Sequence, residues 1–385
     1  MPSPDVVAGS SPCGTTRPDE IARSSPRGAD VAVVGAGIVG CALAAFLAEA
    51  GASVLLVERD DVGAAASGRN SGILQHPMDA ALAPLFAESL DHYRELGEHG
   101  FALPEEPHGV LMLARAALGI SGELTAFPEL HAEVLAPGEP ARIEPVLAED
   151  LAGVRLHTGY PVGPAAATRA FAARALAAGA RIETGAAAAL APGGVTVGGT
   201  LRPAGAVVVA AGPWTPELVE PSGSWRPIAP LWGAVVEVRL DAPPRHAFEE
   251  AGIDQLVARG GDPPPLFSLV TTGALSALGS TFQPERPDAD ALAPLLRERG
   301  ARFVPALART ALGATRACAR PLSADGLPLL GRVPGRDDIF VAAGHGPWGV
   351  SLGPASARLV ADLVLGRSTA PPARFDPRRF SASGT

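Results

Sequence analysis

The residues that could do chemistry begin with a glycine-rich turn, Gly35-Ala36-Gly37-Ile38-Val39-Gly40. This GxGxxG spacing is typical of segments that bind the diphosphate of a dinucleotide. Gly35 permits the tight turn, Gly37 lets the backbone approach the pyrophosphate, and Gly40 lets a helix pack closely on a strand. The amides at the start of that helix, together with its dipole, favour the negative charge of the phosphates.

A carboxylate stands where such a site needs one for a ribose. Glu58 lies eighteen residues beyond Gly40, at the end of the next apolar run. It can accept hydrogen bonds from an adenosine ribose, and it disfavours a 2′-phosphate. We expect the neighbouring Arg59 to contact the same cofactor. FAD and NAD both contain ADP, so these residues fit both, and an ordinary strand-to-helix turn is the alternative.

The elements around the glycine turn have the order that a dinucleotide site requires. Val31–Val34 is a short continuous apolar run, typical of a buried parallel strand. The Ala- and Leu-rich stretch 41–50 indicates a helix that Gly51 ends, and 53–57 is a second strand. Together they predict a strand–turn–helix–strand unit as long as a βαβ crossover.

Elements of two kinds alternate along the rest of the chain. We expect helices over 79–100, 168–178 and 354–366, strands over 109–114, 181–184, 206–211 and 339–343, and antiparallel strands within 227–240 and 266–283. The α/β segments are therefore interrupted by antiparallel ones. This order predicts a discontinuous nucleotide-binding domain into which a second domain is inserted twice.

Composition excludes several classes of protein. The chain has 385 residues, 47% of them apolar, which excludes wholesale disorder. The net charge of −9 and the lack of a basic stripe argue against a nucleic-acid partner. Three cysteines cannot form a disulfide framework, so we expect a reducing, cytoplasmic location and no metal site. No apolar stretch is long enough for a signal peptide or a membrane span.

Three longer motifs identify a family. They are 66–74 (ASGRNSGIL), 320–331 (RPLSADGLPLLG) and 342–355 (AAGHGPWGVSLGPA), and a strand stop at 210–214 (AAGPW) accompanies them. With the glycine turn, they resemble the FAD-dependent D-amino-acid oxidase superfamily, which includes glycine and sarcosine oxidases and D-amino-acid dehydrogenases. The resemblance covers nearly everything from Asp30 to Gly366. It implies FAD as the cofactor and a Rossmann-type, glutathione-reductase-like α/β domain with an inserted antiparallel α+β substrate domain.

The expected domain ranges follow from this resemblance and from the order of elements. The FAD-binding domain is expected over 30–100, 152–224 and 314–370, and the substrate domain over 101–151 and 225–313. Residues 1–29 and 371–385 are expected to be tails. The oligomeric state stays open.

The resemblance also implies which residues lie around the flavin. The loop after Glu58 would contribute Ser67, Gly68, Asn70, Gly72, Ile73 and Leu74, whose small members let the backbone lie flat against the ribityl chain and the ring. The carboxyl-terminal motif would contribute Gly344, His345, Gly346, Pro347, Trp348, Gly349 and Val350, with a helix dipole directed at the flavin N1. The backbone near Ala187 would contact the adenine side.

Two side chains are expected at the substrate. By resemblance, Arg320 binds the substrate carboxylate, because a guanidinium can grip a carboxylate with two hydrogen bonds. A structural ion pair with Asp325 is the alternative. His345 would donate to the flavin or shape the pocket, and a hydrogen-bonded structural histidine is its alternative.

Cys318 and the absence of lysine bear on the flavin chemistry. In sarcosine-oxidase-like relatives a cysteine at a comparable place binds the flavin covalently, which makes Cys318 a possible attachment site, with a small buried cysteine as the alternative. Several amine oxidases of this family use a lysine near N5 to accelerate oxygen reduction. This chain has none, and all 31 of its basic Lys/Arg positions are arginine. That favours a dehydrogenase or a slow oxidase.

The function expected is oxidation of the C–N bond of an amino acid or a secondary amine to an imine, by hydride transfer to flavin N5. Two alternatives stay open, namely oxidation of a 2-hydroxy acid and a catalytically silent flavin subunit of a hetero-oligomer. Hydroxy-acid relatives resemble Asn-Ser-Gly-Val-Ile-His in this loop, and this chain has Gln75 in place of the histidine. That difference weakens the hydroxy-acid alternative.

Overall fold

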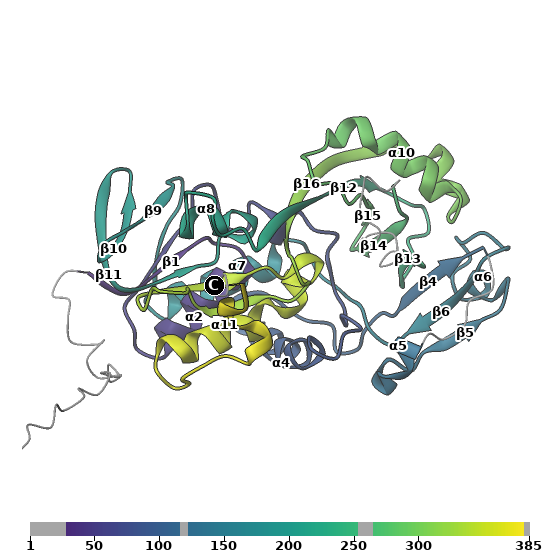
Figure 1. Cartoon of the computed structure of the whole chain (residues 1–385). Helices are drawn as coiled ribbons and strands as arrows, with labels where there is room; N and C mark the ends of the chain where they lie inside the picture. Colours follow the sequence, from purple (N-terminus) through teal and green to yellow (C-terminus); the bar gives the residue numbers. More distant parts are fainter. Residues whose placement is uncertain (1–27, 116–121, 253–264, 381–385) are drawn as a thin grey trace, which may run out of the picture.

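The computed structural model describes residues 28–115, 122–252 and 265–380. Two large mixed sheets dominate the molecule and lie side by side (Figure 1). The expectation of a mixed α/β fold with a Rossmann-type domain is confirmed. Of the tail predicted over 1–29, residues 1–27 with Cys13 fall outside the described residues, as do the last five residues of the chain. The prediction is wrong at Ala29, which is buried and already belongs to the first strand, β1 (Ala29–Val34).

The first sheet carries the glycine turn. Its strands run in the order β17-β18-β11-β1-β2-β8, and all are parallel except β17 at one edge. Their bounds are β1 (Ala29–Val34), β2 (Val54–Val57), β8 (Arg181–Glu183), β11 (Thr200–Val209), β17 (Leu329–Arg332) and β18 (Ile339–Ala343). The strands at the centre are buried on both faces, which explains their continuous apolar sequences. A hairpin of β9 (Ala188–Ala191) and β10 (Gly194–Val197) extends β11.

Helices cover one face of this sheet and form its larger core. α2 (Ile38–Glu49) packs against α7 (Ala166–Ala177) and α11 (Gly349–Val364), and α11 also contacts α4 (Ala83–Arg94) (Figure 1). Eleven of the twelve residues of α2 are buried. A helix enclosed by a sheet and two helices has no solvent face, and this accounts for its nearly uninterrupted run of apolar and small residues.

The second sheet faces the carboxyl ends of the first. Its order is β16-β12-β15-β14-β13-β4-β6-β5. The bounds are β4 (Val110–Ala114), β5 (Glu133–Leu135), β6 (Ala152–Leu156), β12 (Ile228–Val238), β13 (Ala247–Glu250), β14 (Ser268–Thr272), β15 (Leu275–Gly279) and β16 (Leu312–Ser323). All its pairs are antiparallel except β13 with β4. Helix α10 (Ala289–Ala301) and α6 (Glu139–Ile143) accompany it, with α10 packing on β12, β15 and β16.

The smaller elements connect the two sheets. They are α3 (Ala66–Arg69), β3 (Ile73–Leu74), which pairs with β7 (Tyr160–Pro161), α5 (Gly122–Thr125), α8 (Thr215–Val219) and seven short 3-10 turns in the described residues. None of the helices in the described ranges is long and apolar enough to cross a membrane.

The pairing of two strands differs from the expected domain ranges, which stay a prediction. Both β6, which pairs with β4, and β16, which pairs with β12, belong to the second sheet. The expected ranges 152–224 and 314–370 had assigned most of their residues to the FAD-binding domain. A two-residue alternation of side chains shows that a strand forms, but it does not show which sheet the strand joins.

Residues 371–380 are not a loose tail. The Phe375 side chain is buried in the core that the helices form, and Arg379 donates to both carboxylate oxygens of Asp325 at 2.7 and 3.1 Å. This part of the expected tail is corrected, because one aromatic anchor and one bidentate ion pair hold it against the first sheet.

The last helix begins five residues earlier than the expected 354–366. It starts at Gly349, so Pro354 lies inside α11 rather than at its first turn. A proline has no N–H, so the carbonyl of Val350, four residues before it, receives no helical hydrogen bond. The hydroxyl of Tyr93 on α4 donates to that carbonyl at 2.6 Å. The tyrosine thereby satisfies the acceptor that the proline leaves open.

We predict that Y93F destabilises the protein by about 1–3 kcal/mol, because it leaves the partly buried Val350 carbonyl without a donor. The measurement is the free energy of unfolding by urea. In a P354A background residue 354 can donate to the same carbonyl, so Y93F should cost clearly less there. Equal costs of Y93F in the two backgrounds would contradict this account of the helix.

Candidate functional site

A cavity of about 650 Å³ lies between the two sheets. It begins at Val34 and Val57, where β1 and β2 end, and it reaches Leu231 and Val270 on the face of the second sheet. In open α/β sheets ligands bind outside the carboxyl ends of the strands. The cavity therefore lies where a dinucleotide site is expected.

The glycine turn forms one end of this cavity through contacts that exclude any side chain. A Cβ on Gly35 would lie 2.5 Å from the carbonyl oxygen of Ala210, and a Cβ on Gly40 would lie 1.8 Å from the carbonyl oxygen of Gly35. Gly35 has a φ of +107°, which favours glycine on its own. The amide of Ile38 at the start of α2 donates to Ser67 Oγ at 2.9 Å. A hydroxyl and helix amides therefore meet where a diphosphate would lie.

Glu58 is held at the carboxyl end of β2. One carboxylate oxygen accepts from the amide of Ala36 at 2.8 Å, and the other accepts from the amide of Asp60 at 3.0 Å. Glu58 lines the cavity together with Ala187. The guanidinium of Arg59 lies 4.0 Å from the ring centroid of Trp214, an aromatic from the strand stop after β11. These residues form the end of the cavity expected to hold an adenosine.

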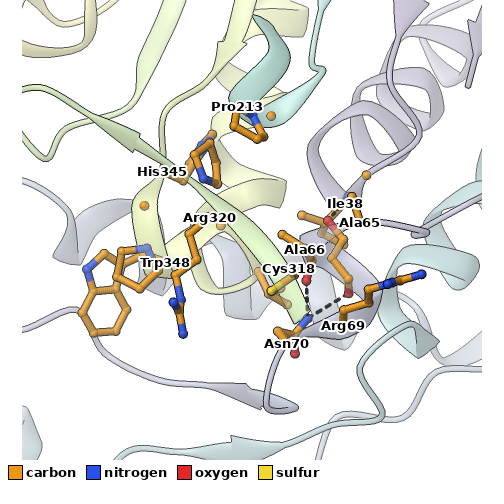
Figure 2. A pocket seen from close by; sticks show the side chains of 18 of the residues that line it. Ile38, Ala65, Ala66, Arg69, Asn70, Pro213, Cys318, Arg320, His345 and Trp348 are labelled. Atoms are coloured by element: carbon orange, nitrogen blue, oxygen red, sulfur yellow. Dashed lines mark hydrogen bonds between the residues drawn. The ribbon is translucent and has the colours of Figure 1, made fainter. Parts of the chain in front are cut away.

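The loop from Ala66 to Gly72 closes on itself through Asn70. The side-chain amide of Asn70 donates to the carbonyls of Ala66 and Ser67 at 3.1 and 2.9 Å, and its oxygen accepts from the amide of Gly72 at 2.8 Å. Figure 2 shows the two bonds that the side-chain amide of Asn70 donates inside the loop. Gly72 has a φ of +86°, and a Cβ there would lie 2.6 Å from the carbonyl oxygen of Val162. The polar atoms of the Asn70 side chain are therefore satisfied inside the loop.

His345 also lines the cavity, and it directly precedes the 3-10 turn Gly346–Trp348 that leads into α11. Its side chain is 2% exposed and its Nε2 has no partner among the described residues. Burial lowers the pKa of His345 to about 4, so the ring is neutral at physiological pH. A neutral imidazole with an unsatisfied nitrogen can bind a ligand group without adding positive charge.

Arg320 extends from β16 into the cavity (Figure 2). Its guanidinium donates to Ser280 Oγ at 2.7 Å and to the carbonyl of Thr281 at 3.1 Å, and it lies 4.6 Å from the ring centroid of Phe282. All these partners are neutral, and no carboxylate of the described residues lies within 4 Å of the guanidinium. The alternative of an Arg320–Asp325 pair is wrong, because Asp325 pairs with Arg379.

A close approach of the backbone makes room for Arg320. A Cβ on Gly233, in the neighbouring strand β12, would lie 2.3 Å from one terminal nitrogen of the guanidinium. Burial lowers the pKa of Arg320 below its usual value, which means that the desolvated cation lacks the stabilisation an anion would give. An arginine held over a glycine, with neutral partners and an open side toward the cavity, is suited to bind an anionic ligand group.

Most of the expected site residues meet around this one cavity: Gly35, Gly37, Ile38, Val39, Glu58, Arg59, Ser67, Asn70, Gly72, Ile73, Ala187, Cys318, Arg320, His345, Gly346, Pro347, Trp348, Gly349 and Val350. Ala36, Gly40, Gly68, Leu74 and Gly344 do not line it. They lie behind the wall and allow its close packing; Cβ atoms on Gly40 and Gly68, for example, would lie 1.8 and 2.2 Å from backbone oxygens.

Sequence reasoning missed several lining residues. Gln75, Ser280 and Phe282 line the cavity, and Ser351 lines it from the first turn of α11. Gln75 is 7% exposed, and its side-chain Oε1 has no partner in the described residues. Its backbone N–H donates to Ser351 Oγ at 3.1 Å. The position of Gln75 directly after the loop could have indicated it, whereas nothing in the sequence connects Ser280 and Phe282 to Arg320.

Cys318 lines the cavity beside the loop residues, as Figure 2 shows. Burial raises the pKa of its thiol above the usual value, although Arg320, Arg316 and Arg69 oppose this effect. The thiolate is the nucleophilic form of cysteine, so burial makes this sulfur a poorer nucleophile than an exposed one.

Comparison with known proteins agrees with this geometry. The model of the DAO family, described as FAD dependent oxidoreductase, matches residues 30–363. A glycine oxidase of Geobacillus kaustophilus is 32% identical over 376 residues, which covers 91% of this chain and 96% of the relative. A glycine oxidase of Pseudomonas aeruginosa is 30% identical and covers 92% of this chain and 98% of its own length.

Solved structures agree with the fold. The crystal structure of glycine oxidase from Geobacillus kaustophilus superposes with a TM-score of 0.75 at 28% identity, covering 92% of this chain and 99% of that one. An L-proline dehydrogenase from P. horikoshii superposes with a TM-score of 0.76 at 23% identity, covering 92% and 98%. At that identity the second likeness concerns the fold alone.

The residues of the cavity fit FAD, which is the cofactor. The glycine turn leaves room for a diphosphate, and Glu58 offers acceptors to a ribose. Two buried polar atoms that lack partners in the described part of the chain, Gln75 Oε1 and His345 Nε2, belong to side chains that line the same cavity. A large polar ligand would remove the cost of leaving such atoms unsatisfied.

We predict that two glycine substitutions three residues apart act differently. Gly37 has an ordinary φ of −75°, and its Cβ would meet only Ser67 Oγ at 3.1 Å. G37A should therefore fold, yet it should weaken FAD binding at least tenfold by filling the space for the phosphates. G40A should lower the unfolding free energy by about 1–3 kcal/mol or more, because its Cβ overlaps backbone. Flavin fluorescence titration and urea unfolding of the apoprotein measure the two effects. Tight FAD binding by G37A would contradict the assignment.

We also predict a pH dependence that His345 causes. Its pKa is about 4 in the folded protein and near 6.5 when unfolded, so the unfolded chain binds the proton more readily. His345 therefore costs no stability above pH 6.5, and it costs about 1.4 kcal/mol for each pH unit as the pH falls from 6.5 to 4. The stability difference between H345N and the wild-type apoprotein should shift in favour of H345N over this interval in urea unfolding at several pH values. Parallel curves would contradict the buried neutral histidine.

Proposed function

The chain belongs to the DAO family of FAD-dependent oxidoreductases, and we propose that it oxidises the C–N bond of a small amino acid or secondary amine that carries a carboxylate. When bound, FAD would supply the acceptor for the hydride of the substrate α-carbon while the amine nitrogen loses a proton, which would leave an imine for water to hydrolyse. The family and the glycine oxidase relatives support oxidation of amines. The carboxylate is the finer part of the proposal, and it depends on Arg320.

Arg320 carries the proposal. Its guanidinium lies in the cavity with Ser280, Thr281 and Phe282 around it, and all three contacts are neutral. A substrate carboxylate would supply the missing charge and accept two parallel hydrogen bonds from the fork. Two bonds fix the rotation of the carboxylate as well as its position, so they determine which hydrogen of the α-carbon faces the flavin.

The other cavity residues act by position rather than by proton transfer. Trp348, Phe282 and Leu231 supply apolar surface that excludes water around the reacting carbon. His345 is neutral at physiological pH and is therefore a weak base there. We infer that the substrate amine loses its proton to solvent and reacts in its neutral form.

A 2-hydroxy acid is the competing substrate. It would use the same arginine, so Arg320 does not distinguish the two classes. The glycine oxidase relatives favour the amine. Gln75 also favours it, because hydroxy-acid relatives resemble a motif with a histidine at this position, and a glutamine side chain cannot accept a proton as a histidine does. Anaerobic bleaching of the bound flavin by matched amino and hydroxy acids separates the alternatives, and reduction by hydroxy acids alone would overturn the proposal. Turnover by the isolated chain would exclude a silent subunit.

We place the protein in the cytoplasm as part of this proposal. Cys41 and Cys318 are free and buried thiols among the described residues, which agrees with a reducing compartment. Cell fractionation checks this location, and recovery outside the cytoplasm would contradict it.

We predict that R320M lowers kcat/KM for amino acids at least a hundredfold, and that R320K loses about tenfold because an ammonium cannot form the paired hydrogen bonds. The corresponding amines without a carboxylate serve as the control, and their kcat/KM should change less than threefold. Steady-state kinetics measure both. Equal losses for acids and amines would show that Arg320 does not bind the carboxylate.

We predict that FAD is bound without a covalent bond, because burial keeps Cys318 protonated. After acid precipitation the yellow colour should remain in the supernatant. A yellow pellet from the wild type and a colourless pellet from C318S would instead establish Cys318 as an attachment site.

A further inference from the structure

Strand β16 presents several functional side chains on one face. Side chains two residues apart along a strand point the same way, so Arg316, Cys318 and Arg320 share a face of β16. Cys318 and Arg320 line the cavity. Arg316 precedes Arg320 by four residues, which is about 13 Å along the strand. It contacts the loop from Ala66 to Gly72, called the flavin loop below, and does not line the cavity. The activity proposed above gives it no role.

The guanidinium of Arg316 joins the second sheet to the flavin loop. Two of its nitrogens, Nε and one terminal nitrogen, donate to the backbone carbonyl of Asn70 at 3.4 and 3.2 Å. The other terminal nitrogen contacts a carboxylate oxygen of Glu237 on β12 at 2.7 Å. The side chain is 16% exposed, so water competes weakly for these bonds.

Asn70 makes this contact consequential for the whole loop. Its side chain bonds to Ala66, Ser67 and Gly72 within the loop, while its own carbonyl points outward to Arg316. The internal bonds make the loop one unit, and the external bond fixes that unit to β16. The same strand carries Arg320, so the loop and the arginine expected at the substrate share one rigid support.

We propose that Arg316 is a positioning residue that sets the distance between the flavin and the substrate carboxylate, by holding the Asn70 loop against the strand that carries Arg320. The inference rests on the proposed function for the role of Arg320. Glu237 orients the guanidinium, and the Asn70 carbonyl receives the bond. Arginine is suited to this position because its planar fork can reach a carbonyl and a carboxylate at once.

The test compares four variants as FAD-loaded full-length protein. R316M removes the bonds and keeps much of the side-chain volume, and R316K keeps one charged donor. E237Q removes the charge of Glu237 but keeps a side-chain oxygen that can accept from the guanidinium, so Arg316 should stay oriented toward the Asn70 carbonyl. R174M is the matched control, because Arg174 is similarly buried at 12% exposure, pairs with Glu49 and Glu95, and does not line the cavity.

Two of the readouts need no substrate. The visible circular dichroism of bound FAD reports how the ring is held, and fluorescence titration gives the FAD dissociation constant. R316M should alter the visible spectrum and weaken FAD binding about tenfold. R316K should lie between R316M and the wild type. R174M and E237Q should match the wild type in both readouts, even where R174M lowers the melting temperature as much as R316M does.

The third readout is anaerobic flavin reduction by an amino acid. R316M should slow the reduction step about 10- to 100-fold, since small misplacement of reacting groups has effects of this size, while the substrate dissociation constant changes less than threefold. A slower reduction step with an unchanged substrate dissociation constant distinguishes a positioning role of Arg316 from a role in substrate binding. If no amine reduces the flavin of the wild-type protein, the proposed function is contradicted. The two readouts that need no substrate would still test the role of Arg316.

Three results would overturn the inference. The first is a wild-type visible spectrum and FAD affinity in R316M. The second is the same changes in R174M, which would show that any lost ion pair has this effect. Where R316M does not fold, R316K decides, and a wild-type spectrum and affinity in R316K would overturn the inference as well.

Discussion

The whole site depends on the close approach of backbone at the glycine turn. The carbonyl of Gly35 lies where a Cβ of Gly40 would be, and the carbonyl of Ala210 lies where a Cβ of Gly35 would be. This approach brings the first turn of α2 against β1, with the amide of Ile38 donating to Ser67 Oγ beside the cavity. The position of the glycine turn therefore determines where the expected cofactor lies relative to Glu58 and to the first turn of α11.

The second sheet contributes its residues to the cavity mainly from two long strands, β12 and β16, rather than from loops. β16 carries Arg320 into the cavity, and its partner β12 leaves out a side chain at Gly233 so that the guanidinium can lie across it. Residues on strands are held more precisely than residues on loops. Electrostatics adds a second constraint, because a buried cation among neutral groups favours an anionic ligand, while neutral His345 adds no competing charge.

The sequence was sufficient for the local parts of this arrangement. The glycine turn, the position of Glu58 and the buried strands follow from spacing and composition, and the resemblance led to Arg320. Contacts between distant segments could not be predicted in the same way. The start of α11 was missed because Pro354 is typical of a first helical turn, and only the distant Tyr93 makes it acceptable inside the helix. The partners of Arg320 and the bond from Arg316 to Asn70 depend on how two sheets meet, which no local pattern records.

We expect the turn at Gly35 to hold the diphosphate of FAD while the second sheet covers its ring. The most direct measurement is the affinity of the apoprotein for FAD, FMN and NAD by isothermal titration, followed by a crystal structure of the complex. We predict one FAD per chain, at least a hundredfold preference over FMN and NAD, and electron density for the diphosphate at the start of α2. Equal affinity for FMN, or a diphosphate bound elsewhere, would contradict it.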